Sequence, residues 1–276
     1  MNRLSIEKRT QILQALVEGN SIRGTCRLTG AAKGTVLKLL YDAGQVCETY
    51  QAKMFRNLRC PRIQADEIWT FCGAKQFNLP KETQEDPTQG DVWTWVGMDA
   101  DTKLIPAWYV GNRELESALE FTRILASRVH TPCQITTDGH GPYIDAMEQA
   151  FGSEADFAML RKEYGCKQGK TSRKHCTGVR RMILQGQPDP DHISTSYVER
   201  QNGRMRTDMR RFARRTNGFS RKLENLRAAV ALHFMNYNFC RVHATVKQTP
   251  AMAIGLACVP MPLDFIVYLL KKQEKA

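Results

Sequence analysis

Long apolar runs are absent from this 276-residue chain. The longest, Phe265 to Leu270, is far shorter than the roughly 20 residues that a membrane-spanning helix requires. The first ten residues, MNRLSIEKRT, contain no apolar core, so they do not resemble a secretory signal. No internal repeat or extended low-complexity segment occurs. These absences predict a folded cytoplasmic protein.

Paired cysteine motifs are also lacking. Nine cysteines are scattered from Cys26 to Cys258, and none of them forms a CxxC pair. An odd count without close spacing does not predict a disulfide framework in a chain of this length, so reduced thiols are expected. Cys166, His175 and Cys176 lie near one another but lack the ligand spacing of a zinc site. We therefore predict no zinc site.

Acidic residues are few relative to basic ones. Lys and Arg total 40 against 28 Asp and Glu, which gives a formal net charge of +12. Clustered cations neutralise phosphates and release their counterions, so this excess predicts a polyanionic partner. The hydrophobic content of 42% is enough for a sizeable core, and the length accommodates one large domain or two smaller ones.

Residues 1–47 are predicted to form a small helical module that binds DNA. Ser21 is a suitable N-cap for a short second helix, and a basic third helix is expected from about Ala31 to Asp42. A short helix, a glycine turn and a basic third helix are typical of a helix-turn-helix, although a three-helix cap or dimerisation module has the same pattern. The outward residues expected to contact DNA are Lys33, Thr35 and Lys38.

The pattern changes after residues 48–60, which are interpreted as a linker. Strands are expected at residues 62–71, 91–98, 104–110, 134–137 and 178–184, and helices at residues 114–129, 142–151 and, with a break near Gly218, 196–239. Three strands followed by alternating helices and strands predict an α/β fold with a mixed sheet over residues 61–217. Residues 218–276 are expected to form a C-terminal helical region. The polar segment 73–90 is expected to be a loop or an insertion.

Three acidic residues stand out by their positions. Asp66 lies inside an otherwise apolar strand, Asp138 at the end of another strand, and Glu199 near the start of the long helix. A carboxylate in a strand is unfavourable unless it is paired or binds a cation, and several carboxylates can hold two divalent ions about 3.5–4 Å apart. Taken singly, each acid is more simply explained as a turn, cap or helix-dipole residue, and spacing alone does not distinguish the three from other acids. The competing acids are Glu67, Asp91, Asp99 and Asp101.

A dense basic segment follows Glu199. Nine cations lie between Arg200 and Lys222 against the single acid Asp208. Residues three and four apart share a helix face, so Asn202, Arg206 and then Arg210 are expected beside Glu199, where they can hold phosphates. A solvated basic face is the alternative, and Met205, Met209 and Phe212 are assigned to the core. The residues predicted to contact DNA are Arg200, Asn202, Arg206, Arg210, Arg214 and Arg215.

A second basic stretch lies between Asp138 and Glu199. With Gly165 and Gly169 it predicts a mobile loop that contacts DNA, or alternatively flexible solubilising charge. Its cations are Arg161, Lys162, Lys167, Lys170, Arg173, Lys174, Arg180 and Arg181.

The acidic positions occur within blocks that resemble those of a known family. From about residue 62 to residue 250, the chain is similar to the bacterial insertion-sequence-one type transposases. The catalytic blocks that carry the likeness are Asp66-Glu67-Ile68-Trp69 with Gly73-Ala74-Lys75, Thr137-Asp138-Gly139 with Pro142-Tyr143, and Glu199-Arg200-Gln201-Asn202 with Arg206. The segments that resemble the C-terminal helices of the family are Phe219-Ser220-Arg221-Lys222 and Asn236-Tyr237 with Arg241 and His243.

The resemblance implies a ribonuclease-H-like fold, with which the expected order of strands and helices agrees. It also implies that Asp66, Asp138 and Glu199 are the catalytic residues and the ligands of two Mg²⁺ ions, for which Mn²⁺ would substitute. Such a DDE transposase cleaves the ends of an insertion element and joins their 3′-hydroxyls to target DNA. Double-stranded DNA, as terminal inverted repeats and target, would be its partner.

Two element ends must be joined together, so a homodimer or higher oligomer on DNA is expected. The place of action would be the nucleoid in a bacterial cytoplasm. Two other functions stay open. A metal-dependent nuclease would use the same carboxylates without strand transfer, whereas a non-catalytic helix-turn-helix regulator would leave most of the chain unexplained.

Overall fold

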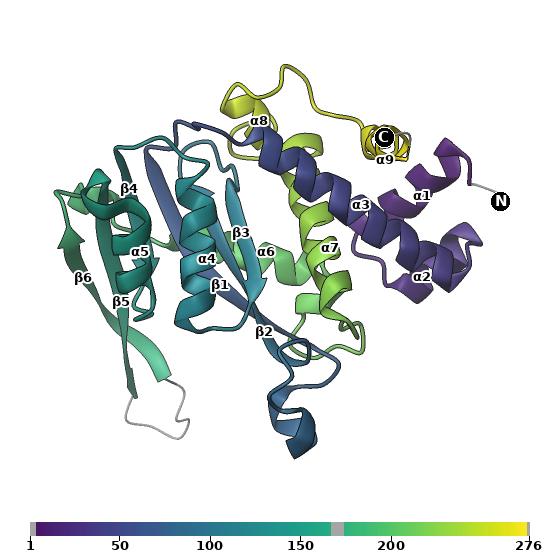
Figure 1. Ribbon diagram of the computed structural model, residues 1–276. Helices are drawn as coiled ribbons and strands as arrows, with labels where there is room; N and C mark the ends of the chain where they lie inside the picture. The colour runs from purple at the N-terminus through teal and green to yellow at the C-terminus, as the bar shows by residue number, and fades with distance from the viewer. Residues whose placement is uncertain (1–3, 167–173, 275–276) are drawn as a thin grey trace.

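The computed structural model describes residues 4–166 and 174–274 as an α/β protein built round a mixed sheet (Figure 1). Within these residues six strands lie in the order β3-β2-β1-β4-β5-β6. β1, β2 and β3 pair antiparallel, β4 is parallel to β1, β5 is parallel to β4, and β6 is antiparallel to β5. The strands are β1 (Arg62–Cys72), β2 (Gly90–Asp99), β3 (Ala107–Gly111), β4 (Cys133–Asp138), β5 (Ala155–Cys166) and β6 (Lys174–Gln185). The predicted α/β class is confirmed.

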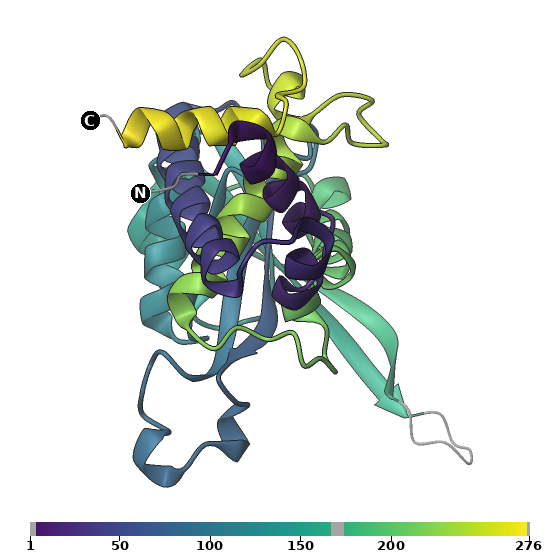
Figure 2. The ribbon, with the colours of Figure 1, turned by 90° about the vertical axis from the view of Figure 1, so that its right-hand side faces the viewer.

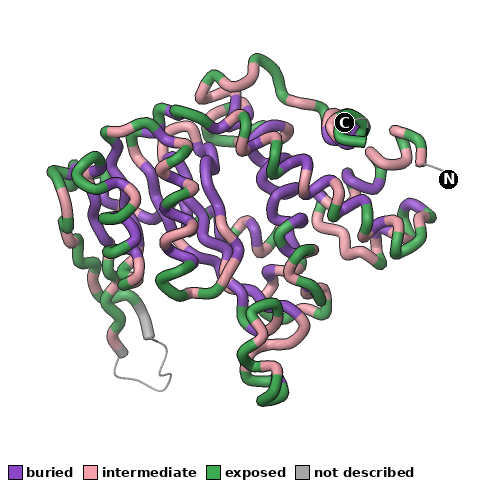
Figure 3. The backbone as a smooth tube through the Cα atoms, in the orientation of Figure 1, coloured by how far each residue is buried: buried purple, intermediate pink, exposed green. Residues whose placement is uncertain are grey.

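Helices cover both faces of the central strands. α4 (Leu115–Ala126) and α5 (Tyr143–Phe151) pack together on one face, and α6 (Ser196–Asp208) packs against β1 and β2 on the other (Figure 1). A strand that is covered on both sides becomes a nearly continuous buried run. Accordingly Ile63, Ala65 and Ile68 of β1 are buried, as Figure 3 shows for the centre of the sheet.

Three helices precede the sheet: α1 (Ile6–Val17), α2 (Ile22–Thr29) and α3 (Lys33–Met54). The Ser21 hydroxyl accepts a hydrogen bond from the Gly24 amide and caps α2, as expected. Gly30 ends α2 in the left-handed conformation, with φ of 67°. The three-helix order agrees with the sequence prediction, and the third helix is longer than predicted.

The expected linker at residues 48–60 is wrong, because α3 continues through it to Met54. Burial explains the extension. Gln51 is buried and donates to the carbonyl of Ala231 in α7 (Leu223–Met235), and its side-chain oxygen accepts from Asn238. α3 also packs against α9 (Asp264–Gln273). The N-terminal helices therefore share one core with the C-terminal helices.

The expected basic loop between Asp138 and Glu199 is also corrected. Arg161 and Lys162 lie on β5, and Arg180 and Arg181 on β6, in a two-stranded hairpin that projects from the body of the protein (Figure 2). Lys167, Lys170 and Arg173 fall outside the described residues. The strand predicted at residues 178–184 is confirmed within β6. Its partner strand, β5, was not predicted. In the projecting hairpin both faces of the two strands are exposed to solvent, so charged residues replace the usual alternation of apolar and polar residues.

The long helix predicted from residue 196 ends at Asp208. The Thr70 hydroxyl donates to the carbonyl of Arg211, and the Gly73 amide donates to the carbonyl of Ser220. These bonds tie the following segment to the end of β1, so the chain runs in an irregular path until α7. The predicted continuation of the α6 face to Arg210 is therefore wrong. Met205, Met209 and Phe212 are buried as predicted.

Short elements complete the chain. The predicted insertion after β1 contains two 3-10 turns and projects beside the sheet (Figures 1 and 2). Across the described residues, no helix has the length and apolar character needed to cross a membrane. The short helices are Gln76–Asn78, Lys81–Thr83, Gly152–Glu154, Pro190–His192, Arg210–Phe212, the π-helical turn Asn236–Cys240 and α8 (Pro250–Ala253).

Candidate metal centre

Two acids predicted from the sequence meet on neighbouring strands. β1 and β4 are parallel, and Ala65 of β1 is paired with Thr137 of β4. Asp66 and Asp138 each follow that pair by one residue, so they lie side by side. Adjacent strands are about 4.8 Å apart, which brings two such carboxylates within reach of one ion.

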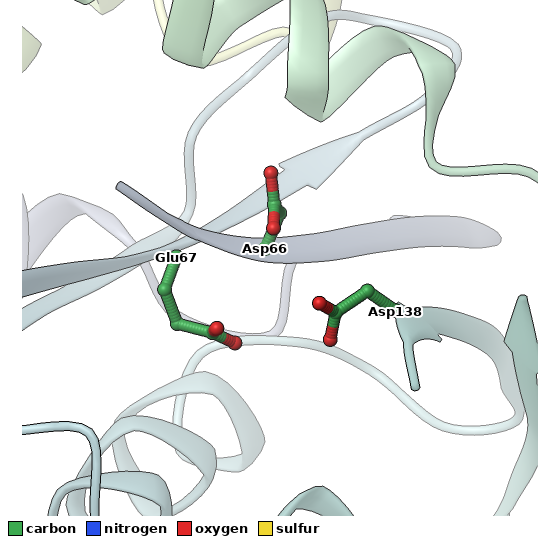
Figure 4. A group of neighbouring side chains, drawn as sticks. All are labelled: Asp66, Glu67 and Asp138. Atoms are coloured by element: carbon green, nitrogen blue, oxygen red, sulfur yellow. The ribbon is translucent and has the colours of Figure 1, made fainter. Parts of the chain in front are cut away.

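A third carboxylate joins them. Ligand oxygens of Asp66, Glu67 and Asp138 all lie within 4.8 Å of one another. Successive side chains of a strand point to opposite faces. Figure 4 accordingly shows Asp66 and Glu67 on opposite sides of β1, with the Asp138 carboxyl turned toward them from the end of β4. Asp66 faces α6, whereas Glu67 faces the layer of α4 and α5.

Asp66 has a neutral partner only. The Asn202 side-chain amide of α6 donates to Asp66 Oδ2 at 2.9 Å, and no cation within the described residues forms an ion pair with this carboxylate. Burial, followed by the charge of Asp138, raises the pKa of Asp66 to about 6. A carboxylate in this state gains free energy from a bound cation.

Glu67 is buried, and its charge is partly compensated by Arg113. Arg113 Nη2 lies 3.1 Å from Glu67 Oε2 and 3.8 Å from Asp138 Oδ2. The buried Tyr143 hydroxyl lies next to the Glu67 carboxyl and lowers its pKa, but by less than burial and the charge of Asp138 raise it. Burial, and then the charge of Asp138, raises the pKa of Glu67 to about 8. The other carboxylate, Asp138, accepts a hydrogen bond at Oδ1 from the His140 backbone amide at 3.0 Å.

Glu199 lies beside this group but outside it. Its Oε2 is 2.5 Å from Lys162 Nζ of β5, and its Oε1 accepts a hydrogen bond from Thr195. Its charge nevertheless contributes to the raised pKa of Asp66, after burial and the charge of Asp138. The structure thus brings Asp66 and Asp138 together and places Glu199 on the adjoining helix face with its carboxylate held by Lys162.

The residues predicted to contact DNA form two groups. Asn202 and Arg206 share the α6 face near Asp66, as the spacing predicts, and Arg206 Nη1 is buried without a hydrogen-bond partner in the described chain. Burial, and then the charge of Arg214, lowers the pKa of Arg206. Arg200 and Arg214 are exposed.

The second group surrounds a cleft of about 1210 Å³ between the N-terminal helices and the segment 208–225, here named the basic cleft. Lys33 and Lys38 lie on its α3 side, and Arg210 and Arg215 on the opposite side. Thr35 is partly buried in the first turn of α3 and does not line the cleft.

The sequence did not predict the role of Arg113 or the contact of Lys162 with Glu199. Arg113 lies in the turn after β3, where no periodic pattern marks it, and Lys162 was assigned to a loop. Glu67 was named only as a competing acid, whereas the structure places its carboxylate in the same group as those of Asp66 and Asp138. Lys162 lies on β5, the strand next to β4 and Asp138, and this neighbourhood could be predicted only if β5 itself had been predicted.

The donor set suits a hard cation. Asp66, Glu67 and Asp138 offer only oxygen atoms, which Mg²⁺ and Mn²⁺ prefer over soft ligands. The Asp66, Glu67 and Asp138 carboxyls have a single cationic partner among the described residues, Arg113, so a bound cation would add compensating positive charge. Comparison with known proteins adds no assignment: no protein-family model and no curated protein matches this chain.

Proposed function

We propose that this protein is a DDE transposase, in which a helix-turn-helix of α1 to α3 binds DNA and a ribonuclease-H-like domain cuts and joins strands. The strand order supports the fold: three antiparallel strands followed by two parallel ones, with acids on β1, β4 and α6. The observation that carries the proposal is the meeting of Asp66 and Asp138, with the Glu199 face of α6 beside them.

The proposed cofactor is a pair of Mg²⁺ ions, held by Asp66, Asp138 and Glu199. When bound, such ions activate the attacking oxygen and stabilise the leaving oxygen of an in-line phosphoryl displacement. Asn202 orients the Asp66 carboxylate through its 2.9 Å hydrogen bond. Arg206 supplies a cation on the same helix face, where it binds a DNA phosphate. The Asp66 and Asp138 carboxylates are both partly buried, which restricts the access of water to the reacting phosphate.

The proposed partners follow from the same assignment. The α3 side chains Lys33, Thr35 and Lys38 bind the terminal inverted repeats, and the α6 face holds the DNA to be cut. Because two ends are joined in one reaction, two copies of the chain act together on DNA, in the nucleoid. Arg200, Asn202, Arg206, Arg210, Arg214 and Arg215 are the proposed DNA contacts of the segment that follows Glu199.

A strand-transfer assay tests this function. Labelled duplexes that carry the DNA bordering the coding sequence are incubated with Mg²⁺ and the wild-type protein, Asp66→Asn or Glu199→Gln. Joined product is expected from wild type and from neither variant. Matched controls are Asp145→Asn and Glu148→Gln, which change exposed acids of α5 and leave joining intact.

Other outcomes separate the alternatives. Nicking without joining by the wild type favours the metal-dependent nuclease. Specific binding without any cleavage by the wild type favours the helix-turn-helix regulator. Equal joining by wild type and Glu199→Gln removes Glu199 from the metal site.

A further inference from the structure

The basic cleft has more cations than its acids can pair. Each acid of its lining already has a partner: Asp42 with Lys38 at 2.8 Å, Asp208 with Arg204 at 3.2 Å, and Glu224 with Lys222 at 3.4 Å. The exposed cations of the lining that form no ion pair with any described residue are Arg23, Lys33, Arg210, Arg215 and Arg221. These five come from both sides of the cleft, so their charges converge on one space.

The cleft also offers groups that recognise bases. Tyr41 of α3 lines it with 39% of its surface exposed, and Phe219 lines the opposite side. His233 of α7 lines it as well and is only 7% exposed, and its Nε2 has no hydrogen-bond partner in the described chain. Converging cations beside an exposed aromatic ring, here that of Tyr41, are features of a groove for single-stranded nucleic acid.

The chemistry of the lining favours one strand over two. The cleft has a volume of about 1210 Å³ and presents the ring of Tyr41 beside its cations. An unpaired strand can stack a base on that ring, whereas a duplex keeps its bases paired and stacked on one another. The cleft begins at Asp208, nine residues beyond Glu199 on the same helix, or about 13 Å at 1.5 Å per residue.

We propose that the basic cleft binds a short stretch of unpaired DNA through the cations of its two sides and the ring of Tyr41. This site deepens the proposed function and rests on it for the identity of the nucleic acid as DNA. The near edge of the cleft lies about 13 Å along α6 from Glu199, so a separated strand held there is close to the proposed site but outside it.

Fluorescence anisotropy with a labelled oligo-thymidine strand tests the proposal without divalent ions. The triple variant Arg210→Gln, Arg215→Gln, Arg221→Gln is compared with wild type over a series of salt concentrations. Each lost phosphate contact reduces the slope of log K against log salt by about 0.7 for a single strand. We expect a slope shallower by about 2, with affinity lower by tenfold to a hundredfold at about 0.1 M salt.

A matched triple variant controls for net charge. Lys53→Gln, Arg56→Gln and Arg59→Gln remove three exposed cations near the far end of α3, about 30 Å from Lys33 at 1.5 Å per residue. This variant is expected to keep the wild-type slope. Equal slopes for wild type and the cleft variant, or an equal loss in both variants, overturn the proposal.

Two further measurements test whether the cleft binds a single strand or a duplex, and whether this binding depends on the proposed catalysis. Tyr41→Ser is expected to weaken single-strand binding on the order of tenfold with no change in salt slope, because stacking carries no charge. A greater loss on duplex than on single strand in the cleft variant overturns the single-strand assignment. Binding is measured in EDTA, where no strand transfer occurs. The binding result therefore tests the cleft even if the protein proves not to be a transposase.

Discussion

Lys162 and Glu199 form an ion pair between β5 and α6, with 2.5 Å between Nζ and Oε2. Lys162 lies 37 residues before Glu199, so the contact depends on the tertiary fold. The carboxylate proposed as the third metal ligand is thus already neutralised by a lysine. A metal ion that takes Glu199 must displace this amine.

Lys162→Met is therefore expected to strengthen divalent-ion binding. The two side chains are about a third exposed, so solvent screens the pair and its contribution is about 0.2–1 kcal/mol. The corresponding gain is about 1.5- to 5-fold in Mn²⁺ affinity, measured by titration with electron paramagnetic resonance detection. Arg180→Met on β6 removes an exposed cation of the same hairpin and is expected to leave the affinity unchanged. Weaker binding in Lys162→Met would contradict a competing role for the lysine.

The two faces of β1 are distinguished by Asp66→Asn and Glu67→Gln. Asp66 faces α6 and has no cationic partner in the described chain, whereas Glu67 already pairs with Arg113. We expect Asp66→Asn to abolish measurable Mg²⁺ binding in isothermal calorimetry, and Glu67→Gln to weaken it less than tenfold. The reverse order of effects would place the ion on the face of α4 and α5.

The raised pKa values of Asp66 and Glu67 predict how the metal-free protein responds to pH. A carboxyl whose pKa is higher in the folded state than in the unfolded state binds its proton more tightly when folded. Its stabilising contribution is complete below the unfolded pKa of about 4 and is lost as pH rises through about 6 for Asp66 and about 8 for Glu67. In EDTA, the melting temperature should fall over this window.

Mg²⁺ should reverse this loss, because the ion binds the deprotonated carboxylates. The rise in melting temperature caused by Mg²⁺ is expected to be small near pH 5 and to grow toward pH 8. Asp66→Asn removes one of the two titrating groups and serves as the comparison. A Mg²⁺ effect that is constant with pH would show that these carboxyls do not bind the ion.

The contact of α3 with α7 sets a stability prediction. A Cβ added at Gly44 would lie 2.4 Å from the Cα of Ala228, whereas one added at Gly34 of the same helix meets no atom within 4 Å. Gly44→Ala is expected to destabilise the protein by about 1–3 kcal/mol, because the two helices must separate. Gly34→Ala should instead be neutral or stabilise by up to about 1 kcal/mol. Urea unfolding of both variants measures the difference.

Much of the central sheet is predictable from the sequence. An acid within an apolar strand and another at a strand end place Asp66 and Asp138 among several candidate acids, and helical spacing places Asn202 on the Glu199 face. These patterns involve residues that are close together in the sequence, so they can be read without knowledge of the tertiary structure. The expected boundaries of β1, β2 and β4 differ from the observed ones by at most one residue at each end.

The remainder depends on contacts between distant residues. α6 stops at Asp208 because Thr70 and Gly73 of the sheet bind the following segment. α3 continues past residue 47 because Gln51 is buried against α7. The pairing of Arg113 with Glu67 joins two segments whose contact has no sequence signature. Helix ends and ion pairs of this kind are set by tertiary burial rather than by propensity.

The extension of α3 into the core fixes the distance between the start of this helix and the sheet that carries Asp66 and Asp138. Its 22 residues span about 33 Å, close to one turn of B-DNA. In the proposed function, the start of α3 binds DNA and no flexible tether separates it from the body that carries Asp66 and Asp138. The interval between the bound sequence and the cut phosphate would then be set by a rigid helix. For a protein acting as proposed, the cleavage position would be constant in base pairs, and the first three helices could not be exchanged for another binding module without rebuilding the α7 surface.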